Sequence, residues 1–264
     1  MSVCTLILFD RSEGANVEQI NDERIDYIAG TDYKVVQSPN VFSYSIDAVL
    51  LARFVHVPMK RGLFLDLCTG NGIIPLILTT RSKGKMIGVD IQERVVELAR
   101  RTVQLNRLEE RIEIIHADIN DLPKQIPPHS FDVVTCNPPY FQTVTEEELN
   151  RNIYLAIARH EICCTLEDVL RTCSRYVKQK GKVALVHRPE RLTDILTLMR
   201  AYRIEPKRLQ FIHPSAGKEA NIVLIEGIKD GKAGVRCLPP LFVYDESRRY
   251  TKQFQQVYEG REDG

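Results

Sequence analysis

The chain lacks several features that would place it in a particular class of protein. No apolar run approaches the roughly 20 residues that a membrane-spanning helix needs, so we expect no membrane partner. The apolar stretch at residues 3–9 has no basic region before it and acidic residues after it, which argues against a signal peptide. The seven cysteines form no C-x-x-C pair, so neither a zinc site nor a disulfide framework is indicated. We expect buried, reduced thiols in a cytoplasmic protein that holds no metal.

What is present is a chain of ordinary globular composition. Its 264 residues can bury a sizeable core, and its net charge is +1. We divide it into an extension over residues 1–40, a main domain over 41–232 and a tail over 233–264. Basic residues outnumber acidic ones between Arg171 and Arg208, which is compatible with a surface that faces nucleic acid. Solvated helix faces explain the same charges equally well. We favour a monomer.

A strand, a glycine turn and a helix follow one another at residues 64–80. The run at 64–68 is apolar enough for a buried parallel strand, and Thr69-Gly70-Asn71-Gly72 leads into an apolar helix. Gly70 and Gly72 allow a ligand to approach the backbone, and the helix N-terminus adds N–H donors. A dinucleotide fingerprint would need a third glycine where Pro75 stands, so a nicotinamide or flavin cofactor is not favoured.

Acidic residues lie in or just after three successive predicted strands. Asp66 belongs to the first strand, Asp90 ends the strand at 86–90, and Asp118 follows the strand at 112–115. The carboxyl ends of parallel strands share one edge of a sheet, so these three carboxylates should lie near one another. Asp90, about twenty residues after the glycines, is placed to accept from both hydroxyls of a ribose. Asp118 is placed to accept from an adenine amine.

The fourth strand, at residues 131–136, ends in Asn137-Pro138-Pro139-Tyr140. Proline cannot donate to a strand ladder and keeps the residue before it extended, so this turn should be stiff. An exocyclic amine of adenine is a poor nucleophile. The Asn137 side-chain oxygen and the Pro138 carbonyl would accept its two hydrogens and stabilise the charge that develops as it attacks a methyl sulfonium. Tyr140, with Phe141, would stack on an extruded base. A plain strand-to-loop turn is the alternative.

The remaining elements complete an alternating α/β pattern. Ser45 is a candidate N-cap, and the polar start of its helix either faces a ligand or belongs to an ordinary docking helix. Thr165 and Asp168 suggest a capping box for a helix that ends at about residue 179, with Gly181 as its stop. We interpret His160-Glu161 as part of a surface ion pair with Arg159. The other predicted elements are a strand at 33–37, helices at 93–106 and 192–202, and strands at 182–187, 208–213 and 222–228. The last two strands are joined by a short turn, which predicts an antiparallel pair.

Four stretches together resemble the bacterial tRNA(Val) adenine-N6 methyltransferases, a class I, S-adenosylmethionine-dependent family. They are FSYSIDAVLLA (42–52), DLCTGNGIIPL (66–76), the GVD and HAD strand ends (88–90 and 116–118) and NPPYF (137–141). The resemblance implies a Rossmann-like, doubly wound α/β sheet of seven strands in the order 3-2-1-4-5-7-6, with the last strand antiparallel. It implies S-adenosyl-L-methionine as cofactor and a tRNA partner methylated at the adenine just after the anticodon, position 37.

The resemblance also assigns residues. It implies donor binding by Asp66, Gly70, Gly72, Asp90 and Asp118. It implies binding of the target amine by Asn137, which also borders the donor, together with Pro138 and Tyr140.

The same NPPY motif occurs in enzymes with other substrates. One alternative is methylation of a release-factor glutamine, whose amide offers a similar planar nitrogen. A second is DNA adenine methylation, which normally needs an additional recognition domain. A third is a non-catalytic RNA-binding module of the same fold, which should have lost Asn137 or the glycines; both are present.

Overall fold

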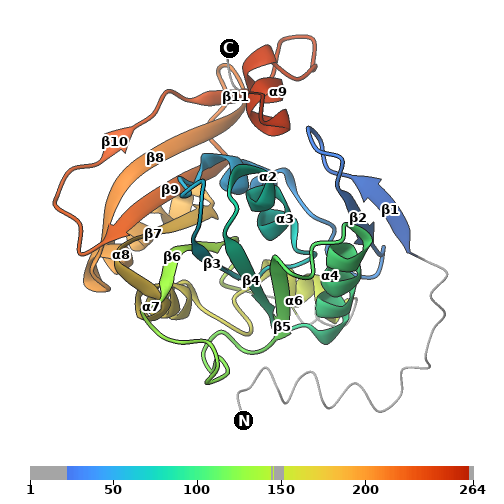
Figure 1. The fold of residues 1–264 in the computed structure, drawn as a ribbon. Helices are drawn as coiled ribbons and strands as arrows, with labels where there is room; N and C mark the ends of the chain where they lie inside the picture. Colours follow the sequence, from blue (N-terminus) through green and yellow to red (C-terminus); the bar gives the residue numbers. More distant parts are fainter. Residues whose placement is uncertain (1–22, 144, 146–151, 262–264) are drawn as a thin grey trace.

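The computed structural model describes residues 23–143, 145 and 152–261. They form a mixed sheet with helices on both faces and a separate two-stranded hairpin (Figure 1). The apolar stretch at residues 3–9 lies outside the described residues. No helix within the described ranges is long and apolar enough to cross a bilayer.

Seven strands of the sheet correspond to the predicted doubly wound core. Along the sheet they are β5 (Ile112–His116), β4 (Lys85–Asp90), β3 (Leu63–Leu67), β6 (Phe131–Cys136), β7 (Val177–His187), β9 (Ile222–Lys229) and β8 (Ile204–Ser215). The first five are parallel to their neighbours, and β9 is antiparallel to both β7 and β8. The predicted order 3-2-1-4-5-7-6 and the antiparallel last strand are confirmed.

The two faces of the sheet are covered by different helices. α2 (Ile46–Phe54), α3 (Ile73–Arg81) and α4 (Glu93–Leu105) enclose one apolar core, and α7 (Leu166–Tyr176) and α8 (Leu192–Ala201) enclose the other (Figure 1). Neighbouring residues of one strand serve opposite cores: Val133 packs in the first and Val134 in the second. Burial on both faces explains why these strands are continuously apolar in sequence.

The C-terminal tail enlarges the sheet to nine strands. β10 (Arg236–Cys237) and β11 (Leu241–Tyr244) both pair in parallel with β8, and α9 (Lys252–Glu259) packs beside α2. The tail could not be assigned from its sequence, because these two strands are short and find their partner only on the long outer edge of β8. Phe254 of α9 is fully buried, which fixes the tail against the first core.

The hairpin of β1 (Arg24–Tyr27) and β2 (Lys34–Gln37) is attached to α4 by side chains. Asn106 accepts from the Lys34 N–H at 2.9 Å and donates to its carbonyl at 2.6 Å, and Thr102 accepts from Val36 N–H at 3.0 Å. The predicted strand at 33–37 is therefore confirmed, and its partner β1, which is mostly exposed, went unpredicted.

Two local predictions are corrected by the structure. α7 has the predicted capping box but ends at Tyr176, not near residue 179, because Val177 already pairs with Phe131 of β6. Gly181 lies inside β7, next to a register shift in that pairing, and does not stop the helix. Ser45 occupies the N-cap of α2, but its side chain makes no capping hydrogen bond.

The cysteines also differ from expectation. Cys68, Cys136, Cys164 and Cys173 carry free thiols in or near the core, but Cys237 is exposed.

Candidate active site

A cavity of about 500 Å³ opens at the carboxyl ends of β3, β4, β5 and β6. β3 and β6 are neighbours in the sheet, and the segments that follow them leave in opposite directions. Doubly wound sheets bind their ligands at such a point. The walls come from the β3–α3 turn, the end of β4, the residues after β5, the turn after β6, the first turn of α2 and the end of α6 (Ile153–Arg159). Seven of the predicted site residues line the cavity: Gly70, Asp90, Asp118, Asn137, Pro138, Tyr140 and Phe141.

The glycine turn leaves space for a ligand against its backbone. Gly70 has φ +55°, and a Cβ added there would meet no atom within 4 Å. Its N–H donates to Asp90 Oδ2 at 2.9 Å, which ties the turn to the end of β4. Gly72 has φ +81° and is the N-cap of α3, but it does not line the cavity. Gly72 therefore shapes the turn, whereas Gly70 borders the ligand space.

Asp66 lies behind the turn and not in the cavity wall, contrary to its predicted contact with the donor. It is 2% exposed, and its two oxygens accept from the hydroxyls of Thr69 at 2.7 Å and Thr135 at 2.6 Å. These bonds connect the glycine turn to β6. Burial raises the pKa of Asp66 from 3.8 to about 7. Asp66 is thus placed to position the turn and does not itself line the cavity.

The raised pKa of Asp66 predicts how stability changes with pH. The unfolded carboxyl loses its proton near pH 4 and the folded one near pH 7, so folding becomes less favourable as pH rises through this window. Each pKa unit corresponds to about 1.4 kcal/mol, giving a loss of up to about 4 kcal/mol at neutral pH. Asp66→Asn should remove this dependence. The free energies of unfolding of the native protein and of Asp66→Asn, measured in urea from pH 4 to 8, should diverge up to about pH 7, as the native protein loses stability relative to the variant. Parallel plots of unfolding free energy against pH would contradict the assignment.

Asp90 is 7% exposed, and both of its carboxylate oxygens accept hydrogen bonds from backbone N–H groups. Besides Gly70 N–H, it accepts from Gln92 N–H at 3.0 Å. Burial raises its pKa, while the bonds from these amides act in the opposite direction. A carboxylate oxygen has two lone pairs, so each oxygen retains the capacity to accept from a ligand hydroxyl.

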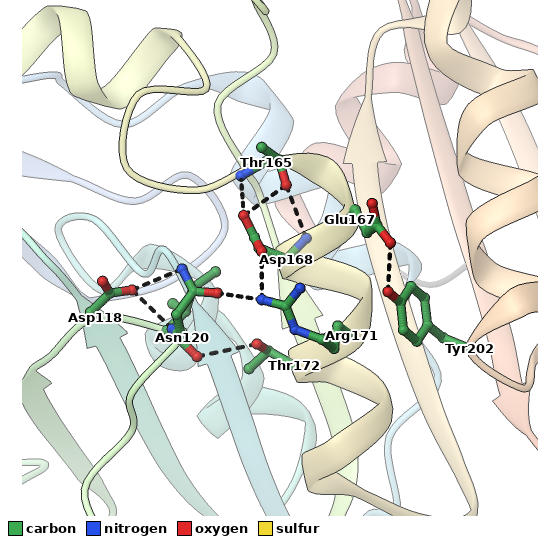
Figure 2. A network of polar contacts seen from close by, with 9 residues as sticks. Asp118, Asn120, Thr165, Glu167, Asp168, Arg171, Thr172 and Tyr202 are labelled. Carbon is green, nitrogen blue, oxygen red and sulfur yellow. Dashed lines mark hydrogen bonds and ion pairs between the residues drawn. The ribbon is translucent and has the colours of Figure 1, made fainter. Parts of the chain in front are cut away.

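Asp118 is held by a chain of polar contacts that reaches α7 (Figure 2). Its Oδ1 accepts from the backbone and the side-chain amide of Asn120, at 2.9 and 3.2 Å. Arg171 donates to Asn120 Oδ1 at 2.7 Å and pairs with Asp168, which is fixed by the Thr165 capping box. The α7 N-terminus therefore orients the carboxylate that borders the cavity.

The Asn137–Phe141 turn is fixed by the end of α6. The carbonyl of Arg159 accepts from the N–H groups of Tyr140 and Phe141, both at 2.9 Å. Phe141 is 46% exposed, and its ring lies 5.5 Å from that of His160. A rigid turn with an exposed aromatic ring at the cavity mouth suits stacking on a planar ligand.

Several site residues were not identified from sequence. The Tyr140 hydroxyl lies 2.8 Å from Asp47 Oδ2 and 2.6 Å from Asn137 Oδ1, and its ring centroid is 5.0 Å from that of His187. Arg188 stands over the same ring at 5.5 Å and lines the cavity. Asp47 belongs to the FSYSIDAVLLA stretch, and the polar start of this helix was the signal that pointed to it.

Burial keeps His187 neutral, and hydrogen bonding keeps the neighbouring thiols Cys68 and Cys164 protonated. His187 is fully buried, and burial lowers its pKa to about 4. Its Nδ1 accepts from Arg188 N–H at 2.8 Å, so Nε2 carries the proton; that atom has no hydrogen-bond partner in the described part of the chain. Hydrogen bonding with Cys136 raises the pKa of Cys68, and bonding with Cys68 raises that of Cys164. These thiols are therefore not thiolate nucleophiles.

The expected surface ion pair at His160-Glu161 is wrong. Glu161 pairs with Arg191, not Arg159, at 2.6 Å, and both side chains are largely buried. His160 is buried and its Nδ1 contacts the Thr143 carbonyl. The two residues pack against the end of the Asn137–Phe141 turn, since Glu161 N–H also donates to the Phe141 carbonyl at 2.7 Å.

The predicted basic surface between Arg171 and Arg208 is mostly neutralised by acids. Arg200 pairs with Glu205 at 3.5 Å and Arg203 with Asp230 at 2.7 Å. Both arginines also precede β8, which runs in the same direction as β7, so they lie at the edge of the sheet opposite the cavity. Within the described ranges, the arginines that line the cavity itself are Arg159 and Arg188.

A doubly wound sheet with the order 3-2-1-4-5-7-6, and a cavity shared by a glycine turn, two acidic strand ends and an Asn-Pro-Pro-Tyr turn, define a class I methyltransferase. Solved structures agree. A predicted O-methyltransferase from Agrobacterium tumefaciens superimposes with a TM-score of 0.66 at 25% identity, covering 83% of this chain and 98% of that one. A putative class I S-adenosylmethionine-dependent methyltransferase from Listeria monocytogenes shares the fold, with a TM-score of 0.53 at 17% identity, covering 74% and 63%.

The chain belongs to the methyltransferase small domain family, whose profile matches residues 32–191. It is 33% identical over 181 residues to a protein of Aeromonas salmonicida named tRNA1(Val) (adenine(37)-N6)-methyltransferase, covering 68% of this chain and 73% of the relative. A protein of the same name from Porphyromonas gingivalis is 30% identical over 165 residues, covering 61% and 64%. The resemblance found in the sequence is thereby confirmed.

Proposed function

We propose that this protein transfers a methyl group from S-adenosyl-L-methionine to N6 of an adenine in tRNA, and that its target is adenine 37 of tRNA1(Val). The Asn137–Tyr140 turn and the donor-side residues Gly70, Asp90 and Asp118 border one cavity, and this arrangement carries the proposal. The relatives' names support the choice of tRNA. A tRNA substrate would make the cytoplasm the place where the protein acts.

The donor side of the cavity fits a nucleoside. Asp90 would accept from the ribose hydroxyls and Asp118 from the adenine amine, while the open space over Gly70 admits the ligand against the backbone. When bound there, S-adenosylmethionine supplies a methyl group on a positively charged sulfur. Asn120 and Arg171 keep Asp118 oriented, and Asp66 keeps the glycine turn in place through Thr69 and Thr135.

The target side holds an amine and a planar ring. Asn137 Oδ1 and the Pro138 carbonyl accept the two hydrogens of the adenine amine, which stabilises the charge that develops on nitrogen during the transfer. Once methylated, the nitrogen carries an acidic proton, which solvent removes. Tyr140 and Phe141 supply aromatic rings for the base, with Phe141 the more exposed of the two.

A methyl-transfer assay tests this function against the alternatives. The protein is incubated with radiolabelled donor and, separately, an unmodified tRNA1(Val) transcript, the same transcript with adenine 37 replaced by guanine, duplex DNA and a release factor. We expect label only in the first transcript. Label in the release factor or the DNA would replace the proposed substrate, and label in none of them would favour a non-catalytic RNA-binding module.

Arg159 and Arg188 are expected to contact phosphates of the tRNA. Arg188 is partly buried beside Tyr140, and Arg159 is exposed at the end of α6, so both positive charges flank the proposed base site. Replacing either with Gln should weaken tRNA binding and reduce the slope of log affinity against log salt by about 0.7–0.9. Filter binding at several salt concentrations measures this.

Arg200→Gln and Arg203→Gln serve as matched controls in that experiment. They remove the same charge from arginines that already pair with acids at the opposite edge of the sheet. If the control variants flatten the slope and the cavity variants do not, tRNA lies on the other edge.

A further inference from the structure

Tyr140 links the amide of Asn137 to a carboxylate from a distant helix. Its Oη lies 2.6 Å from Asn137 Oδ1 and 2.8 Å from Oδ2 of Asp47, which stands 93 residues earlier in the chain. A phenol has a single proton and can donate to only one of these two oxygens. Tyr140 remains protonated, because burial and then the charge of Asp47 raise its pKa.

The orientation of the Asn137 amide resolves this conflict. The oxygen and nitrogen of an asparagine amide occupy equivalent positions, and the surrounding hydrogen bonds determine which one faces a neighbour. With Nδ2 toward Tyr140, the amide donates to Oη, and Oη donates to Asp47. Each of the two contacts of Oη then joins one donor to one acceptor, and Oδ1 is left on the opposite side of the amide.

We propose that Asp47 is a positioning residue for methyl transfer, acting through the Tyr140 hydroxyl to turn Asn137 Oδ1 toward the target amine. This inference rests on the proposed function, in which Oδ1 accepts from that amine. It gives the tyrosine hydroxyl a role beyond ring stacking, because stacking alone would leave Tyr140→Phe with nearly the native rate.

The charge of Asp47 also strengthens the contact to the amine. A carboxylate is a stronger acceptor than a neutral group, and hydrogen bonds in series polarise one another. Asp47 therefore makes Oη a better acceptor, and the bond from Nδ2 to Oη increases the negative charge on Oδ1. Asp47 lies in the first turn of α2, where the helix dipole favours a negative charge.

The neighbours of Tyr140 hold the hydroxyl in place. His187, neutral and fully buried, packs against its ring, and the Arg159 carbonyl fixes its backbone. The ring therefore keeps its position in Tyr140→Phe, so that the loss is confined to the hydroxyl. This makes the substitution a test of the hydrogen-bond chain and not of the fold.

Single-turnover rates at saturating donor and tRNA test the proposal. Tyr140→Phe and Asp47→Ala should each slow methyl transfer about ten- to a hundredfold, the range for loss of a hydrogen bond to a charged group. Asp47→Asn, which keeps an acceptor without the charge, should fall between these variants and the native protein. The double variant Asp47→Ala/Tyr140→Phe should be about as slow as the slower single variant, because either change breaks the same chain.

Three further measurements distinguish positioning from a general loss of structure. Affinity for S-adenosylhomocysteine, affinity for tRNA and the melting temperature should stay close to native in these variants. Exposed Asp32→Asn, which changes the same charge on the hairpin side, should react at the native rate. Native rates in both Tyr140→Phe and Asp47→Ala, or independent effects that multiply in the double variant, would overturn the inference. An inactive native protein would instead overturn the proposed function.

Discussion

We expect Asn137→Ala to slow methyl transfer by about 10²–10³-fold at saturating donor. The Asn137 side chain is proposed to be one of two acceptors on the adenine amine, and removal of one preorganised polar group from developing charge costs about 2.7–4 kcal/mol. The turn itself should persist, because its two prolines and the bonds to the Arg159 carbonyl are unchanged. Single-turnover kinetics with the tRNA transcript measure the effect directly.

The matched control for this variant is Asn221→Ala, an exposed asparagine whose main-chain carbonyl, which accepts from Arg188, is retained. It should transfer methyl groups at the native rate. Affinity for S-adenosylhomocysteine should change little in Asn137→Ala, since the side chain acts on the target. Near-native transfer by Asn137→Ala would place the chemistry away from this turn.

Asp90→Ala should weaken donor binding by about a hundredfold or more. The variant loses two charge-assisted hydrogen bonds to the ribose, each worth about 1.5–3 kcal/mol, and 1.4 kcal/mol corresponds to a factor of ten in affinity. The backbone N–H groups of Gly70 and Gln92 also lose their hydrogen-bond acceptor, which is the Asp90 carboxylate in the native protein. Both effects act on the donor side, so calorimetry with S-adenosylhomocysteine is the appropriate measurement.

Two comparisons separate these effects. Asp90→Asn retains the shape of the side chain and one acceptor oxygen, so it should bind the donor better than Asp90→Ala but worse than the native protein. Exposed Asp121→Ala removes an acid beyond the cavity and should bind normally. A native affinity in Asp90→Ala would exclude Asp90 from the donor site.

Much of the fold was predictable because its signals are local. Glycines at a strand-to-helix turn, prolines at a strand end and continuously apolar strands each limit the backbone within a few residues. Because the carboxyl ends of parallel strands share one edge of the sheet, the sequence also predicted that Gly70, Asp90, Asp118 and Asn137 lie close together, and the four residues line one cavity. The sheet order followed from the resemblance together with the short turn between β8 and β9.

The failures concern contacts between distant segments. The sequence could not show that Arg200 and Arg203 find acids, or that the tail adds strands to β8. Asp66 and Asp90 looked alike as acids at strand ends. In the structure Asp66 points to two threonine hydroxyls behind the turn, whereas Asp90 borders the cavity.

The sequence by itself determined the class of fold, the glycine turn after β3 and the rigid Asn-Pro-Pro-Tyr turn, since short-range sterics and hydrogen-bonding capacity constrain these segments wherever they occur. Only the tertiary structure decided what each side chain touches. The contact of Tyr140 with Asp47 spans 93 residues and depends on how α2 packs against the sheet. The position of α2 on the sheet depends on the sum of buried contacts across both cores, and no local sequence pattern encodes that sum.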